Sequence, residues 1–422
     1  MKKVLFTAAH SGFSLDHIPL GGGAAVCEHL TREWSRTRPF ALEVLGPSLL
    51  GKRAPRGKDL VTFTERQYAR FCIDFERQIT QAVLPHDPKT TVVLSNDVSE
   101  GPDFEQLAAR GYAVYTIYHV DVVDYITAIY LRSWVRPEMT TALFRALKRW
   151  GISGILPPIL KLIWEKQEAS IRHSRGIVVP SARMKDVFLS CYPGLEPERV
   201  HVLPWGAWEN AFPTDEVKKE KTGLQKDFPI SPGSWVFLTL SRISPEKGQD
   251  RLLKALAYWE KQPDFPKDGV SLYVAGEPAY MMGKIYEKKL KKLAANLKRS
   301  RVYFVGYASG ARKKALFEMA DIYVFPSRHE SYGLTLMEAL REGKPVLATP
   351  SHGAQEVFRP EFGEMIAPGP ESEVPGRLVQ SLRRLLSDRQ ALEHHGALAE
   401  TWARHQDFSA TASRLAELVA SQ

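Results

Sequence analysis

Short, continuous runs of apolar residues recur along the second half of the chain and alternate with segments of helical periodicity. Six such runs cover residues 235–241, 270–276, 301–307, 321–327, 344–350 and 364–369. A strand that is buried on both faces of a parallel sheet is apolar throughout, whereas a half-exposed strand alternates. The pattern therefore predicts an α/β domain in which helices cover both faces of a doubly wound parallel sheet.

The first half of the chain repeats this pattern less regularly. Its strand-like runs read "KKVLFTA", "ALEVLGP", "TTVVLSND", "YAVYTIYHV", "RGIVVPS" and "RVHVLPWG". Between them, Phe71, Phe75 and Ile79 recur every four residues, as on the buried face of a helix. We therefore expect two Rossmann-like domains that face each other across a cleft. Ligands bind such folds at the carboxyl ends of the strands.

Local composition suggests where the domains begin and end. Residues 207–234 are rich in Lys, Glu, Pro and Gly, which is typical of a linker region. We therefore expect an N-terminal domain over 1–206 and a C-terminal domain over 207–395. The remaining residues, 396–422, are expected to be helical, and packing back on the N-terminal domain is one arrangement open to them.

Charge and cysteine content limit the environment of the protein. The 422 residues carry a net charge of +9, which favours anionic partners such as nucleotides, anionic lipid or nucleic acid. Cys27, Cys72 and Cys191 are odd in number and lack metal-ligand spacing, which fits a reducing compartment. No run reaches the ~18–20 apolar residues of a membrane span. We expect a cytoplasmic protein, with peripheral contact at the inner face of the membrane left open.

The stretch "PSRHESYGLTLMEAL" places two carboxylates on either side of a glycine turn. A strand ends before it, and a helix begins near Gly333 and closes at Gly343. The free N–H groups at a helix start bind phosphate, and glycine permits close approach of the backbone. Glu330 precedes the turn, and Glu338 lies about 7 Å along the helix axis. Two carboxylates that accept sugar hydroxyls on either side of a diphosphate suit a nucleotide sugar.

A second loop supplies the complementary charge. Arg242 and Lys247 follow the strand 235–241 in "RISPEKGQD" and precede a helix. A guanidinium can hold a diphosphate through two hydrogen bonds, and an ammonium can act as a point charge. Taken alone, these residues could form a salt-bridged loop, and the two glutamates could be solvated. Their shared position at the ends of strands favours one site.

These residues resemble a known family. The segments "SRISPEKGQDRLLKAL", "VYFVGY", "ADIYVFPSRHESYGLTLMEALREGKPVLAT" and "HGAQEVF" are similar to the carboxyl half of the retaining group-one glycosyltransferases of family four, which have the GT-B fold. The resemblance is strong over 235–370 and fair in the first half. It implies a nucleotide-sugar donor held mainly by the second domain and an acceptor held mainly by the first.

The resemblance also implies roles for individual residues. In the second domain, Glu330 would lie beside the donor sugar, Glu338 would bind the ribose, and Arg242 with Lys247 would hold the diphosphate. The resemblance also implies that five further residues of that domain contact the donor, namely Gly306, Tyr307, Tyr332, Gly333 and Leu334.

In the first domain, the resemblance implies that the loop 21–23, with Gly22 and Gly23, approaches the diphosphate. His119 in "YHVD" resembles the active-site histidine of the family. A plain glycine turn and a structural histidine are the alternatives at these positions. Trp205 in "LPWG" replaces an asparagine that many relatives carry.

The reaction implied is transfer of a hexosyl-type sugar, with retained configuration, to a hydroxyl of a saccharide, glycolipid or small molecule. No Asp-x-Asp motif is evident, so we expect no metal and no cofactor, with a UDP- or GDP-sugar as donor substrate. A same-face, ion-pair-like substitution is the implied route.

Other functions remain open from the sequence. A nucleotide-sugar epimerase or hydrolase uses the same architecture, and a peripheral membrane enzyme of glycolipid synthesis is a further alternative. A silent sugar-nucleotide binder would lack catalysis. Nucleic-acid binding rests on charge alone, without a reading motif, and is not expected. Residues 144–167 combine apolar and basic side chains, which fits contact with anionic lipid, burial in the first domain or a place at the acceptor cleft.

Overall fold

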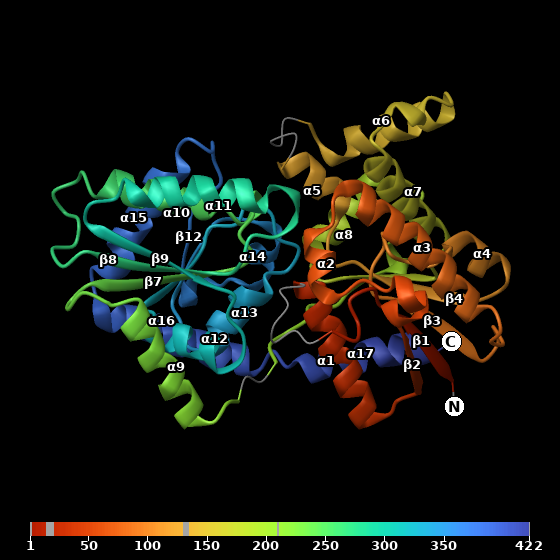
Figure 1. Ribbon diagram of the computed structural model, residues 1–422, viewed down its shortest axis with the longest axis horizontal. Coiled ribbons are helices and arrows are strands. Elements are labelled where there is room, and N and C mark those ends of the chain that lie inside the picture. The colour runs from red at the N-terminus through yellow and green to blue at the C-terminus, as the bar shows by residue number, and fades with distance from the viewer. Residues whose placement is uncertain (1, 14–20, 130–134, 209–210, 422) are drawn as a thin grey trace. The chain divides into compact units, whose positions relative to one another are not determined.

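The computed structural model describes residues 2–13, 21–129, 135–208 and 211–421 (Figure 1). Within these ranges the chain divides into two compact units. Unit 1 comprises residues 1–205 and 408–422, and unit 2 comprises residues 206–407. Each unit is built on a six-stranded sheet in which every pair of neighbouring strands is parallel. The fold class expected from the sequence, two Rossmann-like domains, is confirmed.

The sheet of unit 1 has the order β2-β1-β3-β4-β5-β6. Its strands are β1 (Lys3–Thr7), β2 (Ala41–Leu45), β3 (Thr91–Ser95), β4 (Ala113–Ile117), β5 (Gly176–Val179) and β6 (Val200–Val202). Each of the six apolar runs of the first half contains one of these strands. The continuous apolar character of β3 and β5 follows from burial, because every residue of both strands is buried.

The helices of unit 1 lie between these strands along the chain, except for the last helix of the protein, which follows unit 2. They are α1 (Gly22–Thr37), η1 (Pro47–Arg53), α2 (Gly57–Thr62), α3 (Glu65–Val83), α4 (Phe104–Ala109), α5 (Val122–Ile129), α6 (Pro137–Arg149), η2 (Ser153–Ile155), α7 (Pro158–His173), α8 (Ala182–Cys191), η3 (Pro197–Arg199) and the last helix α17 (Phe408–Ala420). The predicted helix face of Phe71, Phe75 and Ile79 is confirmed, since all three side chains of α3 are buried.

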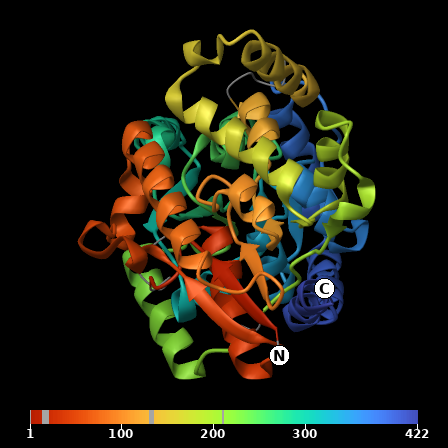
Figure 2. The ribbon, with the colours of Figure 1, turned by 90° about the vertical axis from the view of Figure 1, so that its right-hand side faces the viewer.

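The last helix returns to the unit in which the chain starts. α17 packs against α1, and the indole N–H of Trp34 donates to the carbonyl of Ala412 at 3.0 Å. The Thr411 hydroxyl donates to the carbonyl of Pro204 at 2.7 Å. Unit 1 therefore contains both the first strand and the last helix of the chain (Figure 2).

The sheet of unit 2 has the order β12-β11-β10-β7-β8-β9. Its strands are β7 (Trp235–Leu240), β8 (Val270–Ala275), β9 (Ser300–Gly306), β10 (Ile322–Phe325), β11 (Val346–Ala348) and β12 (Gly363–Met365). Each of the six runs predicted as strands overlaps one of them.

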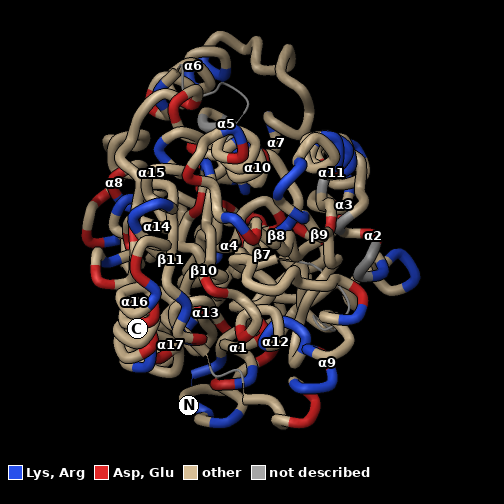
Figure 3. The backbone as a smooth tube through the Cα atoms, turned by 90° about the vertical axis from the view of Figure 1, so that its left-hand side faces the viewer, with Lys and Arg blue, Asp and Glu red and all other residues tan. Residues whose placement is uncertain are grey.

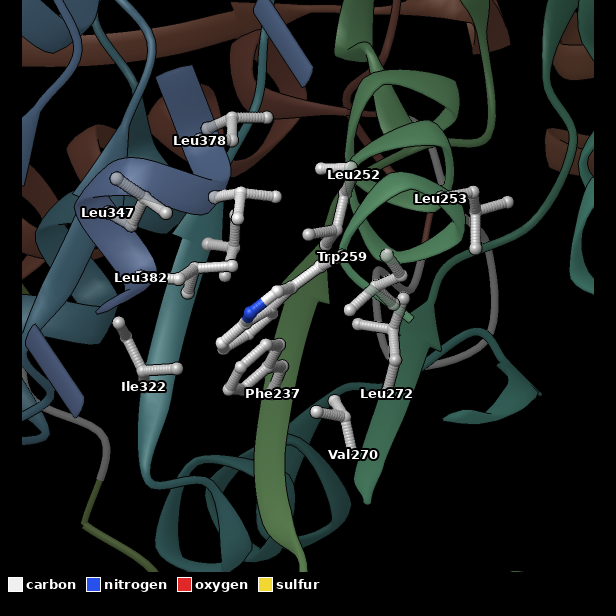
Figure 4. Close-up of a cluster of buried hydrophobic side chains, with 14 of the residues drawn as sticks. Phe237, Leu252, Leu253, Trp259, Val270, Leu272, Ile322, Leu347, Leu378 and Leu382 are labelled. Atoms are coloured by element: carbon white, nitrogen blue, oxygen red, sulfur yellow. The ribbon is translucent and has the colours of Figure 1, made fainter. Parts of the chain in front are cut away.

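Helices flank this sheet and bury the apolar side chains of its strands. They are α9 (Thr214–Asp227), η4 (Pro245–Lys247), α10 (Gln249–Trp259), α11 (Tyr280–Ala295), α12 (Gly310–Met319), α13 (Leu334–Arg341), α14 (His352–Val357), η5 (Pro360–Phe362), α15 (Val374–Leu386) and α16 (Arg389–Arg404). Figure 4 shows the core in which Trp259 of α10 lies among Phe237 and other side chains of the sheet and of α15. One face of α11 is exposed to solvent and carries several lysines, which belong to the blue (Lys and Arg) residues of Figure 3.

Two details of the domain boundaries differ from the sequence interpretation. The region 207–234, interpreted as a linker, contains the helix α9, which packs on α12. Residue 395, expected to end the second domain, lies inside α16, and the chain enters unit 1 only at Phe408. A helix of charged residues with few apolar positions resembles a linker in composition, which explains the first difference.

Candidate functional site

The turn between β10 and α13 has the conformation that the glycine predicted. Gly333 precedes the helix with φ of 84°, in the left-handed region that glycine adopts readily. A β-carbon at this position would lie 3.2 Å from the ring of Phe325. The helix begins at Leu334, so its predicted start is confirmed, and its first free N–H groups lie at the carboxyl edge of the sheet.

A second glycine, in another segment of the chain, packs against this turn. The N–H of Gly353, in the first turn of α14, donates to the carbonyl of Glu330 at 2.7 Å. A β-carbon on Gly353 would lie 2.4 Å from the carbonyl carbon of Tyr332. The backbone of the segment "HGAQEVF" therefore lies directly against the glycine turn. No larger residue fits at Gly353 unless one of the two backbone segments shifts.

Lys247 and Glu330 form an ion pair. Lys247 ends η4, which follows β7, and its Nζ lies 2.6 Å from Oε1 of Glu330. Both side chains are largely buried, with 11% and 13% of their surface exposed. The hydroxyl of Ser327 also donates to Glu330 Oε1, at 3.2 Å. The sequence predicted that both residues belong to one site, but did not predict that they pair with each other.

Arg242 lies close to the same loop. Its guanidinium is 3.9 Å from Oε1 of Glu246, a buried carboxylate that also accepts a 2.5 Å hydrogen bond from Ser244. Burial raises the pKa of Glu246, but the charges of Arg242 and Lys247 outweigh it and lower the pKa below its usual value. Arg242 and Lys247 therefore act on one carboxylate and belong to the same cluster of charges.

Glu338 is paired with a residue that the sequence interpretation did not identify. Lys313 of α12 places its Nζ 2.6 Å from Glu338 Oε1. Only 8% of the Glu338 side chain is exposed, so its charge requires a partner. Lys313 could not be singled out from the sequence, because its helix has the ordinary basic composition of a solvated surface.

The side chain of Tyr323 joins the end of β7 to the first turn of α13. Its buried hydroxyl donates to the carbonyl of Leu240 at 3.0 Å and lies 2.9 Å from the hydroxyl of Thr335. Burial raises the pKa of Tyr323, and the charges of Glu338 and Glu330 raise it further. Glu330 and Glu338 thus both lie near the point where β7 and β10 end. The structure brings together the four predicted charged residues.

The other predicted residues of unit 2 lie along the same edge of the sheet. Gly306 ends β9 in a left-handed conformation with φ of 74°, and Tyr307 follows it. Tyr332 is buried, and its hydroxyl accepts a 2.9 Å hydrogen bond from the N–H of Gly206, a use of the side chain that the sequence did not predict. Burial raises its pKa to about 12.

A network of charged and polar side chains holds the loop that carries Lys247. The guanidinium of Arg328 donates to Asp250 Oδ1 at 2.7 Å and to the carbonyl of Pro245 at 2.9 Å. Asp250 also accepts a 2.7 Å hydrogen bond from Tyr286. Burial raises the pKa of Asp250, but these bonds lower it well below its usual range. The network fixes the loop that carries Lys247, and sequence reasoning missed it because Arg328 and Asp250 lie far apart along the chain.

The predicted residues of unit 1 gather at the carboxyl edge of its own sheet. His119 follows β4, and its Nε2 lies 3.1 Å from Oδ1 of Asn96, which follows β3. Gly22 and Gly23 form the first turn of α1 rather than a loop, with Gly21 before them at φ of 94°. A β-carbon on Gly23 would lie 3.0 Å from the ring of His119. The glycine therefore admits the histidine ring against the helix.

Among the described residues, no group of three or more His, Cys, Asp or Glu side chains is arranged to hold a metal ion. None of the helices in the described ranges is long and apolar enough to cross a bilayer.

Comparison with known proteins agrees with this geometry. Residues 220–402 match the family model described as "Glycosyl transferases group 1". An alpha-monoglucosyldiacylglycerol synthase of Streptococcus pneumoniae is 30% identical over 55% of this chain and 45% of its own length. A D-inositol 3-phosphate glycosyltransferase of Streptomyces griseus is 29% identical over 82% of this chain and 79% of its length.

A solved structure shares the fold over the whole chain. The crystal structure of Anabaena HepE in complex with UDP and glucose superposes with a TM-score of 0.64, covering 100% of both chains at 17% identity. The chain spans about half the length of the first curated relatives that it matches, at 45%, 47% and 55%. The match covers all four charged residues of the cluster in unit 2. Residues 220–402 are therefore similar in sequence to the group 1 glycosyl transferases.

Proposed function

We propose that this protein transfers a sugar from a nucleotide-sugar donor to a hydroxyl group of an acceptor, with retention of configuration and without a metal ion. The observation that carries the proposal is the cluster of Arg242, Lys247, Glu330 and Glu338 around the start of α13. Cations and free backbone N–H groups stabilise a diphosphate, and carboxylates accept hydrogen bonds from sugar hydroxyls.

The ion pairs suggest how the donor would bind. Lys247 neutralises Glu330 at 2.6 Å, so neither charge is left uncompensated in a largely buried position. A bound diphosphate would compete for Lys247 and release the Glu330 carboxylate to accept from a sugar hydroxyl. As the bond to the leaving group breaks, negative charge grows on the diphosphate, and Arg242 and Lys247 would stabilise it.

The remaining contacts follow from position along the sheet edge. Glu338 would accept from the ribose hydroxyls, with Lys313 holding its carboxylate in place. Backbone N–H groups near Tyr332, Gly333 and Leu334 would face the diphosphate, and Gly306 with Tyr307 would lie along the base. In unit 1, His119 would orient the donor sugar, and Gly22 and Gly23 would approach the diphosphate. We favour a UDP-sugar as donor, supported by the UDP complex of the similar HepE fold.

The function is tested by adding UDP-, GDP- and ADP-sugars to the purified chain and measuring its melting temperature. The true donor should raise it, since a ligand that binds only the folded state stabilises it. Proton NMR of the products, with and without mixed hydroxyl acceptors, then identifies transfer and its anomeric configuration. Donor loss without any acceptor product indicates a hydrolase, and a changed sugar still attached to its nucleotide indicates an epimerase. Lack of stabilisation by every donor would contradict the proposal.

We also propose that unit 1 contacts an anionic membrane through α6 and η2. Large apolar side chains with 44–72% exposure concentrate on this segment, namely Met139, Leu143, Trp150, Ile152 and Ile155. Arg149, in the last turn of α6, adds positive charge to the same segment. An amphipathic surface of this kind binds the interface of anionic lipids and weakens as salt screens the charges. The acceptor would then be a lipid presented at that surface.

Vesicle cosedimentation tests the membrane contact. We expect binding to vesicles of phosphatidylcholine with phosphatidylglycerol at low salt, and loss of most binding in the double variant Trp150→Ser, Ile155→Ser. The matched control is Tyr258→Ser, Ile285→Ser, which removes two exposed apolar side chains from unit 2. Equal sedimentation of both double variants, or none of the wild type at low salt, would refute the contact.

A further inference from the structure

A hydrogen-bonded chain of polar side chains lies at the carboxyl edge of the unit 1 sheet. It runs from His10, after β1, through Asp97 and Asn96, after β3, to His119, after β4. The distances are 3.4 Å from His10 Nδ1 to Asp97 Oδ2, 3.1 Å from Asn96 Nδ2 to Asp97 Oδ2, and 3.1 Å from Asn96 Oδ1 to His119 Nε2. Only His119 was recognised from the sequence.

The orientation of the Asn96 amide follows from its surroundings. Its Nδ2 faces two groups that can only accept, the carboxylate of Asp97 at 3.1 Å and the carbonyl of Gly23 at 3.4 Å. An ionised carboxylate has no proton to give, and the NH₂ group has two protons. The amide oxygen must therefore face His119. Asn96 is fully buried, so it cannot exchange these partners for water.

Asp97 is ionised in this arrangement. Burial raises its pKa, but the hydrogen bond and charge of His10, the charge of His119 and the bond from Asn96 lower it below its usual value. His10 and Asp97 keep 17% and 16% of their side-chain surface exposed. The carboxylate therefore acts as the fixed acceptor from which the orientation of the next group is determined.

The state of the His119 ring follows from Asn96. An amide oxygen only accepts, so Nε2 must carry a proton. Burial lowers the pKa of His119 to about 4, against an upward effect of Asp97, so the ring is neutral at pH 7 even though part of it reaches the surface. A neutral imidazole with a proton on Nε2 has a bare Nδ1. Trp205 lies beside the ring, with centroids 5.8 Å apart, and contributes to its apolar surroundings.

We propose that Asn96 is a positioning residue that, held by Asp97 and His10, keeps His119 in the Nε2–H tautomer and so presents Nδ1 as an acceptor for a sugar hydroxyl. This inference rests on the proposed function for the contact with sugar, but not for the tautomer. It assigns the roles of the two ring nitrogens, one bonded inward to the protein and one available to a donor hydroxyl. A tautomer with its proton on Nδ1 would instead offer a donor.

The arrangement explains a glycine that the sequence interpretation assigned to the diphosphate. The carbonyl of Gly23 accepts from Asn96, and a β-carbon on Gly23 would lie 3.0 Å from Cδ2 of His119 and 3.6 Å from Oδ1 of Asp97. Gly23 therefore contributes to the same network in which Asn96 orients His119.

The test reads the tautomer directly. Protein labelled with ¹⁵N-histidine is measured by long-range ¹H–¹⁵N correlation at pH 7, with His119→Gln used to assign the signals. We expect a protonated Nε2 and a bare Nδ1 for His119. In Asn96→Asp, a carboxylate replaces the amide oxygen and stabilises the imidazolium, so the titration midpoint of His119 should rise by about one unit or more. His201, whose pKa is also lowered by burial, is an internal reference that should not move.

Steady-state kinetics separate positioning from structure. Asn96→Asp should lower kcat about tenfold or more at pH 7, with a smaller change in KM for the donor and partial recovery of kcat as the pH rises. Asn96→Ala serves as a second variant and should give mixed tautomers and a similar loss. An Nδ1–H tautomer or a charged ring in the wild type overturns the inference. Unchanged kcat in both variants overturns the positioning role. A wild type with the expected tautomer but no transfer activity instead contradicts the proposed function.

Discussion

The carboxyl edges of the two sheets hold different kinds of polar groups. In unit 2, opposite charges meet in pairs at 2.6 Å, Lys247 with Glu330 and Lys313 with Glu338. In unit 1, hydrogen bonds link two imidazoles, a carboxylate and an amide in one chain, from His10 through Asp97 and Asn96 to His119. Ion pairs can exchange one partner for a charged ligand, whereas a network of directed hydrogen bonds keeps one geometry. We infer that unit 2 supplies charge for the leaving diphosphate and that unit 1 supplies orientation.

The largest expected effect comes from removing a positive charge from unit 2, which tests the contrast between the two sheet edges. We expect Lys247→Ala to lower kcat about 100- to 1,000-fold, because the loss of one electrostatic contact to a developing charge has effects of that size. It also leaves Glu330 unpaired beside the diphosphate. Initial rates at saturating donor measure the effect. Lys314→Ala is the matched control, since Lys314 pairs with Glu342 at 2.7 Å in the same unit and should retain kcat within a factor of three.

Arg242→Ala should behave in the same way as Lys247→Ala, with a greater loss in kcat than in donor affinity. Full activity in either variant would show that the cations of unit 2 do not act on the reaction. A loss in Lys314→Ala as large as in Lys247→Ala would show that any broken ion pair disables unit 2.

The backbone of the glycine turn is tested by Gly353→Ala. The added methyl group would lie 2.4 Å from the Tyr332 backbone, so the turn before α13 must shift. A strain of about 2 kcal/mol, typical of overpacking, corresponds to a loss of about thirtyfold in kcat/KM if it falls on the site. Gly376→Ala is the control, because a β-carbon there meets nothing within 4 Å. It should leave kcat/KM unchanged. Equal kcat/KM in the two variants would contradict a role for this close approach.

The fold could be predicted further than the site. The strands of both units carry continuous apolar runs because burial on two faces leaves no polar positions, and such runs are visible without any neighbour. The turn at Gly333 was equally visible, since only glycine adopts its conformation readily. Lys313 and Asn96 were not, because their roles depend on helix packing and strand order. Glu338 meets Lys313 only because the fold brings α12 and α13 within reach of an ion pair, and Asn96 meets His119 only because β3 and β4 are neighbours.

Glu338 distinguishes binding from catalysis within unit 2. We expect Glu338→Gln to raise KM for the donor about tenfold and to leave kcat within a factor of three, because a charge-assisted hydrogen bond contributes about 1.5–3 kcal/mol. Donor titrations at saturating acceptor measure both constants. Glu342→Gln, at the C-cap of α13, is matched in residue type and lysine partner, and its KM should remain that of the wild type. The assignment fails if the two variants raise KM equally.

The smallest expected effect is a loss of stability of unit 1 at acidic pH. Since burial lowers the pKa of His119 to about 4, against about 6.5 in an unfolded chain, the folded state binds fewer protons between these values. The free energy of unfolding of unit 1 should therefore fall as the pH drops from about 6.5 to 4, and this part of the fall should be absent in His119→Gln.

Hydrogen exchange of peptides from β3 and β4, compared at pH 7 and 5 after correction for intrinsic rates, measures unit 1 separately from unit 2. Protection should decrease less on acidification in His119→Gln than in the wild type. Peptides from β7 and β10 should respond alike in both proteins, because the charged groups at their ends are paired with one another and do not include His119. An equal loss of protection in the two proteins would mean that His119 is protonated without cost. The contrast between a charged edge in unit 2 and a hydrogen-bonded, neutral histidine in unit 1 would then be wrong.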